Sequence, residues 1–162
     1  MVRIRGMSTS CYRSEIVPMI LNKTILILED DLLTLSKILE RLSKIEQDQP
    51  YDFSVITLTN YMQVQHFVND NPAIQVDMIL LDRDCKLAGS FHVVDLERFG
   101  ADRVIAISSV PDYNKQAQAR GVSRVVLKDY RNLDAFADRL AEEVEDLIKH
   151  LPMREDNIVH PT

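Results

Sequence analysis

The chain has 162 residues, of which 46% are hydrophobic, 27% charged and 6% aromatic, the composition of one globular domain with terminal extensions. This excludes collagen-like and fully disordered chains, and two cysteines without CxxC spacing exclude a disulfide framework and a structural zinc site. The net charge of −6 repels phosphate backbones, so we expect the folded body to bind no nucleic acid.

The chain also lacks the signals of membrane insertion and secretion. No apolar run approaches the roughly 20 residues that are needed to cross a bilayer, and the basic opening segment is followed by no clear cleavage site of small residues. Because unpaired cysteines suit a reducing compartment, we expect a cytoplasmic protein that contacts no membrane.

The first predicted elements are a strand and a helix. Residues 1–22 show no sustained hydrophobic period, which predicts a flexible leader. Residues 24–28 form a continuous apolar run, which is typical of a strand buried on both faces. Apolar residues then recur at spacings of three and four over 32–45, which predicts a helix with Asp31 near its positive end.

The alternation of strand and helix continues through the middle of the chain. Residues 53–58 are predicted as a second strand, Asn60 can cap a helix that extends to about Asn69, and residues 76–81 are predicted as a third strand. A short helical stretch is expected over 91–99.

The last two units follow the same pattern. Residues 104–107 are predicted as a fourth strand, and Pro111 suits the first turn of a helix that Gly121 ends. Residues 124–127 then form the fifth strand, and residues 133–148 carry the apolar stripe of a long final helix.

Five β/α units indicate one domain over residues 23–150, followed by a disordered tail over 151–162. Their short connections predict an open parallel sheet with helices on both faces, joined by right-handed crossovers.

Acidic, hydroxyl and basic residues follow four of the predicted strands, where open parallel sheets bind ligands. These residues are Glu29, Asp30, Asp82, Ser108 and Lys128. Three carboxylates at one edge need a cation, and oxygen-only ligands favour Mg2+. Lys128 and Ser108 could each bind a phosphoryl oxygen, which makes Asp82 a candidate nucleophile toward phosphorus.

These residues stand in four motifs that resemble the receiver domains of two-component response regulators, the CheY-like superfamily. The motifs are KTILILEDD (23–31), DMILLD (77–82), IAISS (105–109) and GVSRVVLK (121–128). The resemblance covers about residues 22–150 and implies a flavodoxin-like (βα)5 doubly wound parallel sheet with strand order 2-1-3-4-5.

The resemblance further implies that Asp82 is the phosphoacceptor, with Ser108 as the switch hydroxyl and Lys128 as the phosphate-pairing lysine. Glu29 and Asp30 would match the acidic metal pair of the family. With Asp82 and the backbone carbonyl of Asp84, they would hold Mg2+.

The function implied is that of a single-domain response regulator. It would take its phosphoryl group from a histidine kinase or a histidine phosphotransfer protein and signal through contacts with an unknown target protein. Its only catalysis would be Mg2+-dependent self-phosphorylation and self-dephosphorylation, so it would not be a conventional enzyme. Many receivers dimerise, so the resemblance also allows a homodimer.

The chain departs from the family pattern at several positions. Asp129 follows the lysine where the family usually has proline, and Val125 replaces the usual inward-swinging aromatic. Tyr113 and Tyr130 could substitute for that aromatic. The segment between Asp82 and Ser108 is short, so the helix within it is expected to be stunted.

Simpler roles compete for several of these residues. Asp30 or Asp31 could merely cap the first helix, Ser109 competes with Ser108, and Lys128 could be a solvated charge at a strand end. Cys85 is expected to be an inert thiol because no base is evident near it.

Two other functions remain open. A pseudo-receiver would keep the fold and bind its partner without phosphorylation, which the departures at Val125 and Asp129 favour. A haloacid-dehalogenase-like phosphatase would use Asp82 and Asp84 as its DxD motif. That family places its acidic metal pair downstream of the motif, whereas Glu29 lies upstream.

Overall fold

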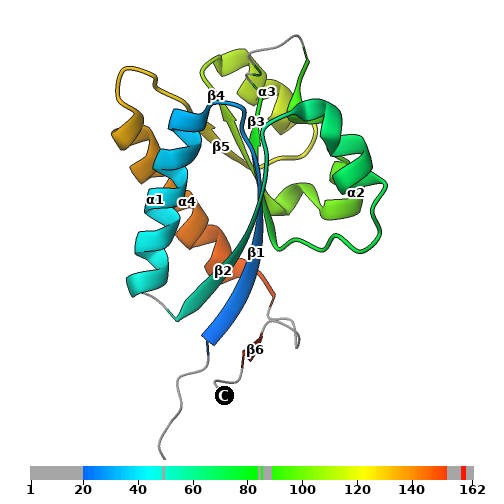
Figure 1. Ribbon diagram of the computed structural model, residues 1–162. Helices are drawn as coiled ribbons and strands as arrows, with labels where there is room; N and C mark the ends of the chain where they lie inside the picture. The colour runs from blue at the N-terminus through cyan, green and yellow to red at the C-terminus, as the bar shows by residue number, and fades with distance from the viewer. Residues whose placement is uncertain (1–19, 49, 84, 86–88, 153–157, 160–162) are drawn as a thin grey trace, which may run out of the picture.

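The structure is a computed structural model of the chain, and it describes residues 20–48, 50–83, 85, 89–152 and 158–159 (Figure 1). Five parallel strands form a sheet in the order β2-β1-β3-β4-β5, which confirms the predicted flavodoxin-like topology. The strands are β1 (Ile20–Leu28), β2 (Tyr51–Leu58), β3 (Met78–Asp82), β4 (Val104–Ser108) and β5 (Arg124–Leu127).

Helices cover both faces of this sheet (Figure 1). One face carries α1 (Leu32–Asp48) and α4 (Leu133–His150). The other face carries the short helices and turns η1 (Tyr61–Gln63), η2 (Gln65–Asn69), η3 (Phe91–Val93), α2 (Leu96–Phe99) and η4 (Ala101–Arg103), together with α3 (Pro111–Ala119). None of the helices in the described part of the chain is both long and apolar enough to cross a membrane.

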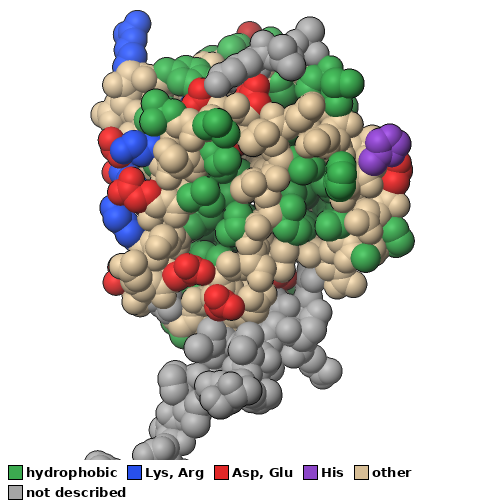
Figure 2. Space-filling view, in the orientation of Figure 1, with side chains coloured by type: hydrophobic (Ala, Val, Ile, Leu, Met, Phe, Trp, Pro, Cys, Tyr) green, Lys and Arg blue, Asp and Glu red, His purple; other side chains and the backbone are tan. Residues whose placement is uncertain are grey.

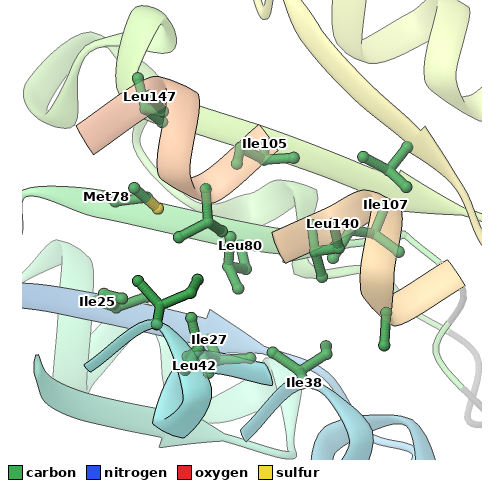
Figure 3. Packing of buried hydrophobic residues seen from close by; sticks show 14 of the residues in the cluster. Ile25, Ile27, Ile38, Leu42, Met78, Leu80, Ile105, Ile107, Leu140 and Leu147 are labelled. Carbon is green, nitrogen blue, oxygen red and sulfur yellow. The ribbon is translucent and has the colours of Figure 1, made fainter. Parts of the chain in front are cut away.

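The central strands are buried because apolar clusters enclose them from both faces. Every residue of β3 and β4 is buried, and Ile25 to Leu28 of β1 are fully buried. Figure 3 shows the cluster under α1 and α4, where Leu42 and Leu140 pack toward Ile27 and Leu80. Continuous apolar runs therefore produce strands that are buried on both faces, as predicted.

The start of the sheet differs from the prediction. β1 begins at Ile20, four residues earlier than the predicted strand, because Leu21 donates its N–H to the carbonyl of Pro50 and pairs with Tyr51 of β2. Of the predicted leader, residues 1–19 lie outside the described residues. In the predicted tail, β6 (Ile158–Val159) pairs antiparallel with the first two residues of β1.

The helical segment after β2 has a different form from the one predicted. Asn60 accepts a hydrogen bond from the Met62 N–H, so its capping role is confirmed. A 3-10 turn and a π turn follow instead of a regular helix, and the π turn closes with the Asp70 N–H donating to the Gln65 carbonyl.

The described part of the segment between Asp82 and Ser108 is also irregular. The expected helix over 91–99 is interrupted at Val94, whose ψ of 138° is extended. Asp95 then caps α2 by accepting from the N–H groups of Glu97 and Arg98. The expectation of a stunted helix is confirmed, since α2 spans only Leu96–Phe99. Side-chain bonds from Asn69, Arg98 and Arg120 connect this segment to its neighbours.

Candidate functional site

The register of the sheet brings the predicted site residues to one edge. Leu28 pairs with Leu81, so Glu29 follows β1 at the level of Asp82, the last residue of β3. Asp82 in turn pairs with Ile107, one residue before the end of β4. On the far side, the Lys128 N–H donates to the Ser108 carbonyl, which places Lys128 directly after β5. Residues separated by about a hundred positions therefore converge at the carboxyl ends of the strands.

A buried ion-pair network forms the centre of this site. The Nζ of Lys128 lies 2.8 Å from Oε2 of Glu29 and 3.0 Å from Oδ1 of Asp82, and all three side chains are fully buried. Lys128 is thus not a solvated charge at a strand end. A buried pair of this kind is retained at a desolvation cost, and removal of either partner leaves an uncompensated charge.

The charge states in this network are set by burial and by the neighbouring groups. Burial, together with repulsion from Asp82, raises the pKa of Glu29 to about 7, although Lys128 counteracts both effects. Burial disfavours the charged form of Lys128, but attraction to Asp82 and Glu29 outweighs this and raises its pKa above the ordinary value. Lys128 is therefore a permanent cation in a region of excess negative charge.

Three carboxylates provide the ligands that a divalent cation needs. Glu29, Asp30 and Asp82 each offer one oxygen, and these oxygens lie within 4.8 Å of one another. The set contains only oxygen atoms, which suits a hard cation such as Mg2+ or Mn2+. Asp84, whose carbonyl is the remaining predicted ligand, lies outside the described residues.

The acids after β1 have separate roles. Asp31 caps α1, because its Oδ1 accepts from the Thr34 N–H at 2.8 Å. Its own N–H donates to Oε1 of Glu29 at 2.9 Å, which orients the Glu29 carboxylate. Asp31 thus makes the capping bond, and Asp30 is a member of the acidic cluster.

Ser108 is the buried hydroxyl of this edge. Its side chain is fully buried, and its Oγ accepts from the Val110 N–H at 3.0 Å. Ser109, the competing residue, is only partly buried in the turn before α3. Ser108 thus lies on the strand that pairs with β3, one position beyond the partner of Asp82.

Two tyrosine rings lie beside the basic residues of the site, at positions that the sequence alone does not determine. The Tyr130 ring lies 5.5 Å from the Lys128 Nζ, and 53% of Tyr130 is exposed. The Tyr113 ring lies 4.6 Å from the guanidinium of Arg83, the residue after Asp82. Arg83 received no role from the sequence, and only its position next to Asp82 could have indicated one.

A small pocket of about 140 Å³ opens beside the acidic cluster, lined by Asp30, Thr59, Asn60, Tyr61 and Cys85. Burial, with the neighbouring carboxylates, raises the pKa of the Cys85 thiol to about 11. The thiol is therefore neutral near pH 7, which agrees with the expected inert role.

The departures from the family motif have local structural consequences. Asp129 begins a turn, because its Oδ1 accepts from the Arg131 N–H and its carbonyl accepts from the Asn132 N–H. Asn132 then caps α4 by accepting from the Ala135 N–H. Val125 is partly buried against the apolar cluster under α2 and α3.

Comparison with known proteins gives a result only at the level of structure. No protein-family profile and no curated protein sequence matches the chain. The phosphorylated cyanobacterial phytochrome response regulator RcpA superimposes with a TM-score of 0.65 at 19% identity, covering 81% of this chain and 99% of RcpA.

Two further solved structures give similar values. The Mn2+-bound form of the response regulator Rcp1 has a TM-score of 0.63 at 16% identity, covering 82% of this chain and 99% of Rcp1. A response regulator receiver domain from Rhodospirillum rubrum has a TM-score of 0.56 at 15% identity, with coverage of 82% and 99%. The chain therefore has the fold of a CheY-like response regulator receiver domain.

Proposed function

We propose that the chain is the receiver of a two-component system and that Asp82 accepts a phosphoryl group from a histidine kinase or a histidine phosphotransfer protein. The observation that carries this proposal is the buried contact of Lys128 with Glu29 and Asp82. Together with Asp30, these two acids form a cluster whose carboxylate oxygens lie within 4.8 Å of one another. The similar structures include a phosphorylated regulator, RcpA, and a Mn2+-bound one, Rcp1.

The transfer would exchange one bond to phosphorus for another. A carboxylate oxygen of Asp82 attacks the phosphorus, the P–N bond to the donor histidine breaks, and the imidazole leaves with the electron pair of that bond. Lys128 pairs with a phosphoryl oxygen, and the Ser108 hydroxyl donates to another. A divalent cation, held by Glu29, Asp30 and Asp82, would neutralise charge on the carboxylates and the incoming group.

The output of this reaction would be a contact with another protein. The phosphoryl group adds charge where β3, β4 and β5 end. Ser108 ends β4 shortly before α3 begins, and Lys128 follows β5 shortly before α4 begins. A change in these segments would alter the surface that the target protein recognises.

The test uses a small phosphodonor such as acetyl phosphate with Mg2+. Intact-mass measurement should show one added phosphoryl group that hydroxylamine removes, and Asp82→Asn should abolish it. Asp112→Asn changes an exposed acid on α3 and should leave the adduct unaffected. Failure to form the adduct, or its persistence in Asp82→Asn, would overturn the proposal.

A phosphorylation-independent adaptor is the second candidate. It is favoured by Val125 in place of the usual aromatic and by Asp129 in place of the usual proline. Amide chemical shifts distinguish the two functions: the proposed receiver should show changes in α3, β5 and α4 when Asp82 is phosphorylated. An adduct at Asp82 without such changes would instead support the adaptor.

The phosphatase alternative requires Asp84 to act as an acid, and this residue lies outside the described part of the chain. Its acidic partners, Glu29 and Asp30, come from a strand that precedes Asp82 rather than from a downstream segment. Turnover of a generic phosphomonoester, lost in Asp84→Asn, would support this function over the receiver.

A further inference from the structure

The edge strand β2 leaves backbone hydrogen-bonding groups open on its outer side. It pairs with β1 over its whole length, and no other strand among the described residues pairs with it. The bonds from Leu21 to the carbonyl of Pro50 and from Glu29 to the carbonyl of Leu58 show that even-numbered residues face β1. The N–H and C=O groups of the odd-numbered residues, Tyr51 to Thr57, therefore point outward.

Only part of this outer edge is covered. The Phe53 N–H donates to Oε1 of Glu46, at 2.6 Å, so α1 protects the first half of the strand. No hydrogen bond from a described residue reaches the outward groups of Val55 and Thr57, and both residues are exposed. The sequence YDFSVITL contains no proline, glycine, lysine or arginine, the residues that usually protect an edge, and Asp52 is its only charge.

Apart from Glu46, the helix surface next to this edge is uncharged. Glu46 bonds the Phe53 N–H, so its side of α1 faces β2. Four more residues lie on this side, because they precede Glu46 or one another by three, four or seven positions. They are Leu32, Ser36, Leu39 and Ser43, all exposed. The basic residue Lys37 instead faces α4, where it contacts Asp134.

Exposed apolar residues also lie on the other flank of β2. Met62 of η1 is 67% exposed, Phe67 of η2 is 58% exposed, and Val55 on the strand itself is 38% exposed. Figure 2 shows this face of the molecule, with hydrophobic side chains along its centre, Lys and Arg along its left side, and Asp and Glu at its top and in its lower part. An open strand flanked mainly by apolar and uncharged side chains is suited to pairing with another strand.

We propose that two copies of the chain associate through β2, antiparallel, about a two-fold axis at Val55. Only odd-numbered residues face outward, so Val55 would exchange both hydrogen bonds with Val55 of the second copy. The Thr57 N–H would donate to the Phe53 carbonyl of the second copy, while the Phe53 N–H keeps its bond to Glu46. The two sheets become one continuous sheet across this axis.

The same register explains why a second copy fits this edge. Asp52 lies opposite Leu58 of the second copy, so the only charges on the two strands do not meet. The two-fold axis places both α1 helices on one face of the joined sheet, where their uncharged stripes meet. The outward N–H groups of Val55 and Thr57 find acceptors on the second copy without any other chain, and the interface does not involve Asp82 or its phosphorylation.

The first experiment measures the molar mass of the full chain by light scattering over a range of concentrations. Wild type should form a dimer, and Val55→Lys and Thr57→Lys should shift it to monomer because a charged side chain blocks the edge. Gln118→Lys, an exposed position on α3, is the matched control and should stay dimeric. Circular dichroism checks that each variant is folded.

The second experiment tests the register in a Cys11→Ser, Cys85→Ser background. The Cα atoms of a hydrogen-bonded antiparallel pair lie about 5.5 Å apart, within the range of about 4.4–6.8 Å for disulfides. Val55→Cys should therefore form an intermolecular disulfide. Asp52→Cys should not, because the two copies of that position would lie about 20 Å apart along the strands.

Several results would overturn the proposal. They are a wild type that is monomeric at every concentration, a dimer that both lysine variants leave intact, and cross-linking at position 52 but not 55. A monomer that binds an extended peptide along β2 would also overturn it and would assign the edge to a partner. Asp82→Asn should remain dimeric, so failure of the proposed phosphorylation would be distinguishable.

Discussion

Lys128 is the residue on which the electrostatics of the site depend. Its ammonium group contacts two carboxylates that are themselves fully buried. Water does not screen such charges, so a cation beside the carboxylates favours their ionised forms. Glu29, whose pKa is already raised to about 7 with Lys128 present, would take up a proton more readily without it.

We therefore expect Lys128→Met to destabilise the protein by about 3–5 kcal/mol in the absence of divalent cation, because it leaves buried carboxylates without their counter-charge. Urea denaturation at pH 7 measures this loss. A divalent cation should restore part of the stability by taking over the role of the ammonium group.

The matched control is Lys115→Met, which breaks the exposed ion pair between Lys115 and Asp112. Exposed pairs contribute about 0–1 kcal/mol. An equal loss in the two variants would contradict the buried role of Lys128.

The site residues could be predicted from the sequence because they directly follow strands. The carboxyl ends of parallel strands lie at one edge of the sheet, so the predicted strand order already places Glu29, Asp82 and Lys128 close together. The roles of Asp31 and Tyr130 could not be predicted in this way. Side-chain contacts decide which acid caps α1 and where the Tyr130 ring lies. Only tertiary packing determines these contacts.

Among the elements, the best predicted were those with a strong hydrophobic pattern. β5 has the predicted bounds, and the expected end of α3 at Gly121 is confirmed. Gly121 has a φ of 92°, and the N–H groups of Gly121 and Val122 donate to the carbonyls of Gln118 and Ala117. These two bonds form a Schellman motif, which requires a residue in the left-handed region.

Gly121→Ala should accordingly destabilise the protein by about 1–2 kcal/mol, because an L side chain is strained at positive φ. A Cβ at this position would meet the Ala101 Cβ at 3.4 Å, an ordinary contact, so the loss reports backbone strain rather than a clash. Thermal and urea denaturation measure it. Gly121→Asn should cost less than Gly121→Ala, and the reverse order would contradict the assignment to backbone conformation.

The short helical elements between β2 and β4 were the least predictable from the sequence. Their residues suit a helix as well as a turn, but long-range hydrogen bonds decide their form. The Arg98 guanidinium donates to the carbonyls of Val68, Asn69, Asn71 and Ile74, and Arg120 donates to those of His92 and Val94. An arginine that satisfies carbonyls of a distant segment leaves no periodic signal in the sequence.

At the scale of the whole molecule, the acidic cluster joins parts of the chain that are otherwise separate. Glu29 and Asp30 follow β1, whereas Asp82 ends β3, and all three must approach to within 4.8 Å. Repulsion among them opposes the folded state, and an unfolded chain does not hold them together. A divalent cation should therefore bind the folded state in preference to the unfolded one.

We expect Mg2+ and Mn2+ to raise the thermal midpoint of the wild type in a saturable way. The free energy of unfolding should increase by about 2.7 kcal/mol when the free cation reaches a hundred times its dissociation constant. Thermal denaturation followed by circular dichroism, in chelator and then at increasing cation concentrations, measures this effect.

Asp30→Asn removes one ionised ligand and should weaken the response to the cation, since hard cations favour charged oxygen ligands. Asp112→Asn removes an exposed acid from α3 and should keep the wild-type response, so it separates binding at the cluster from general screening. If both variants respond like the wild type, the cation acts on the surface charge of the molecule. The acids at the strand ends would then be held by Lys128 alone.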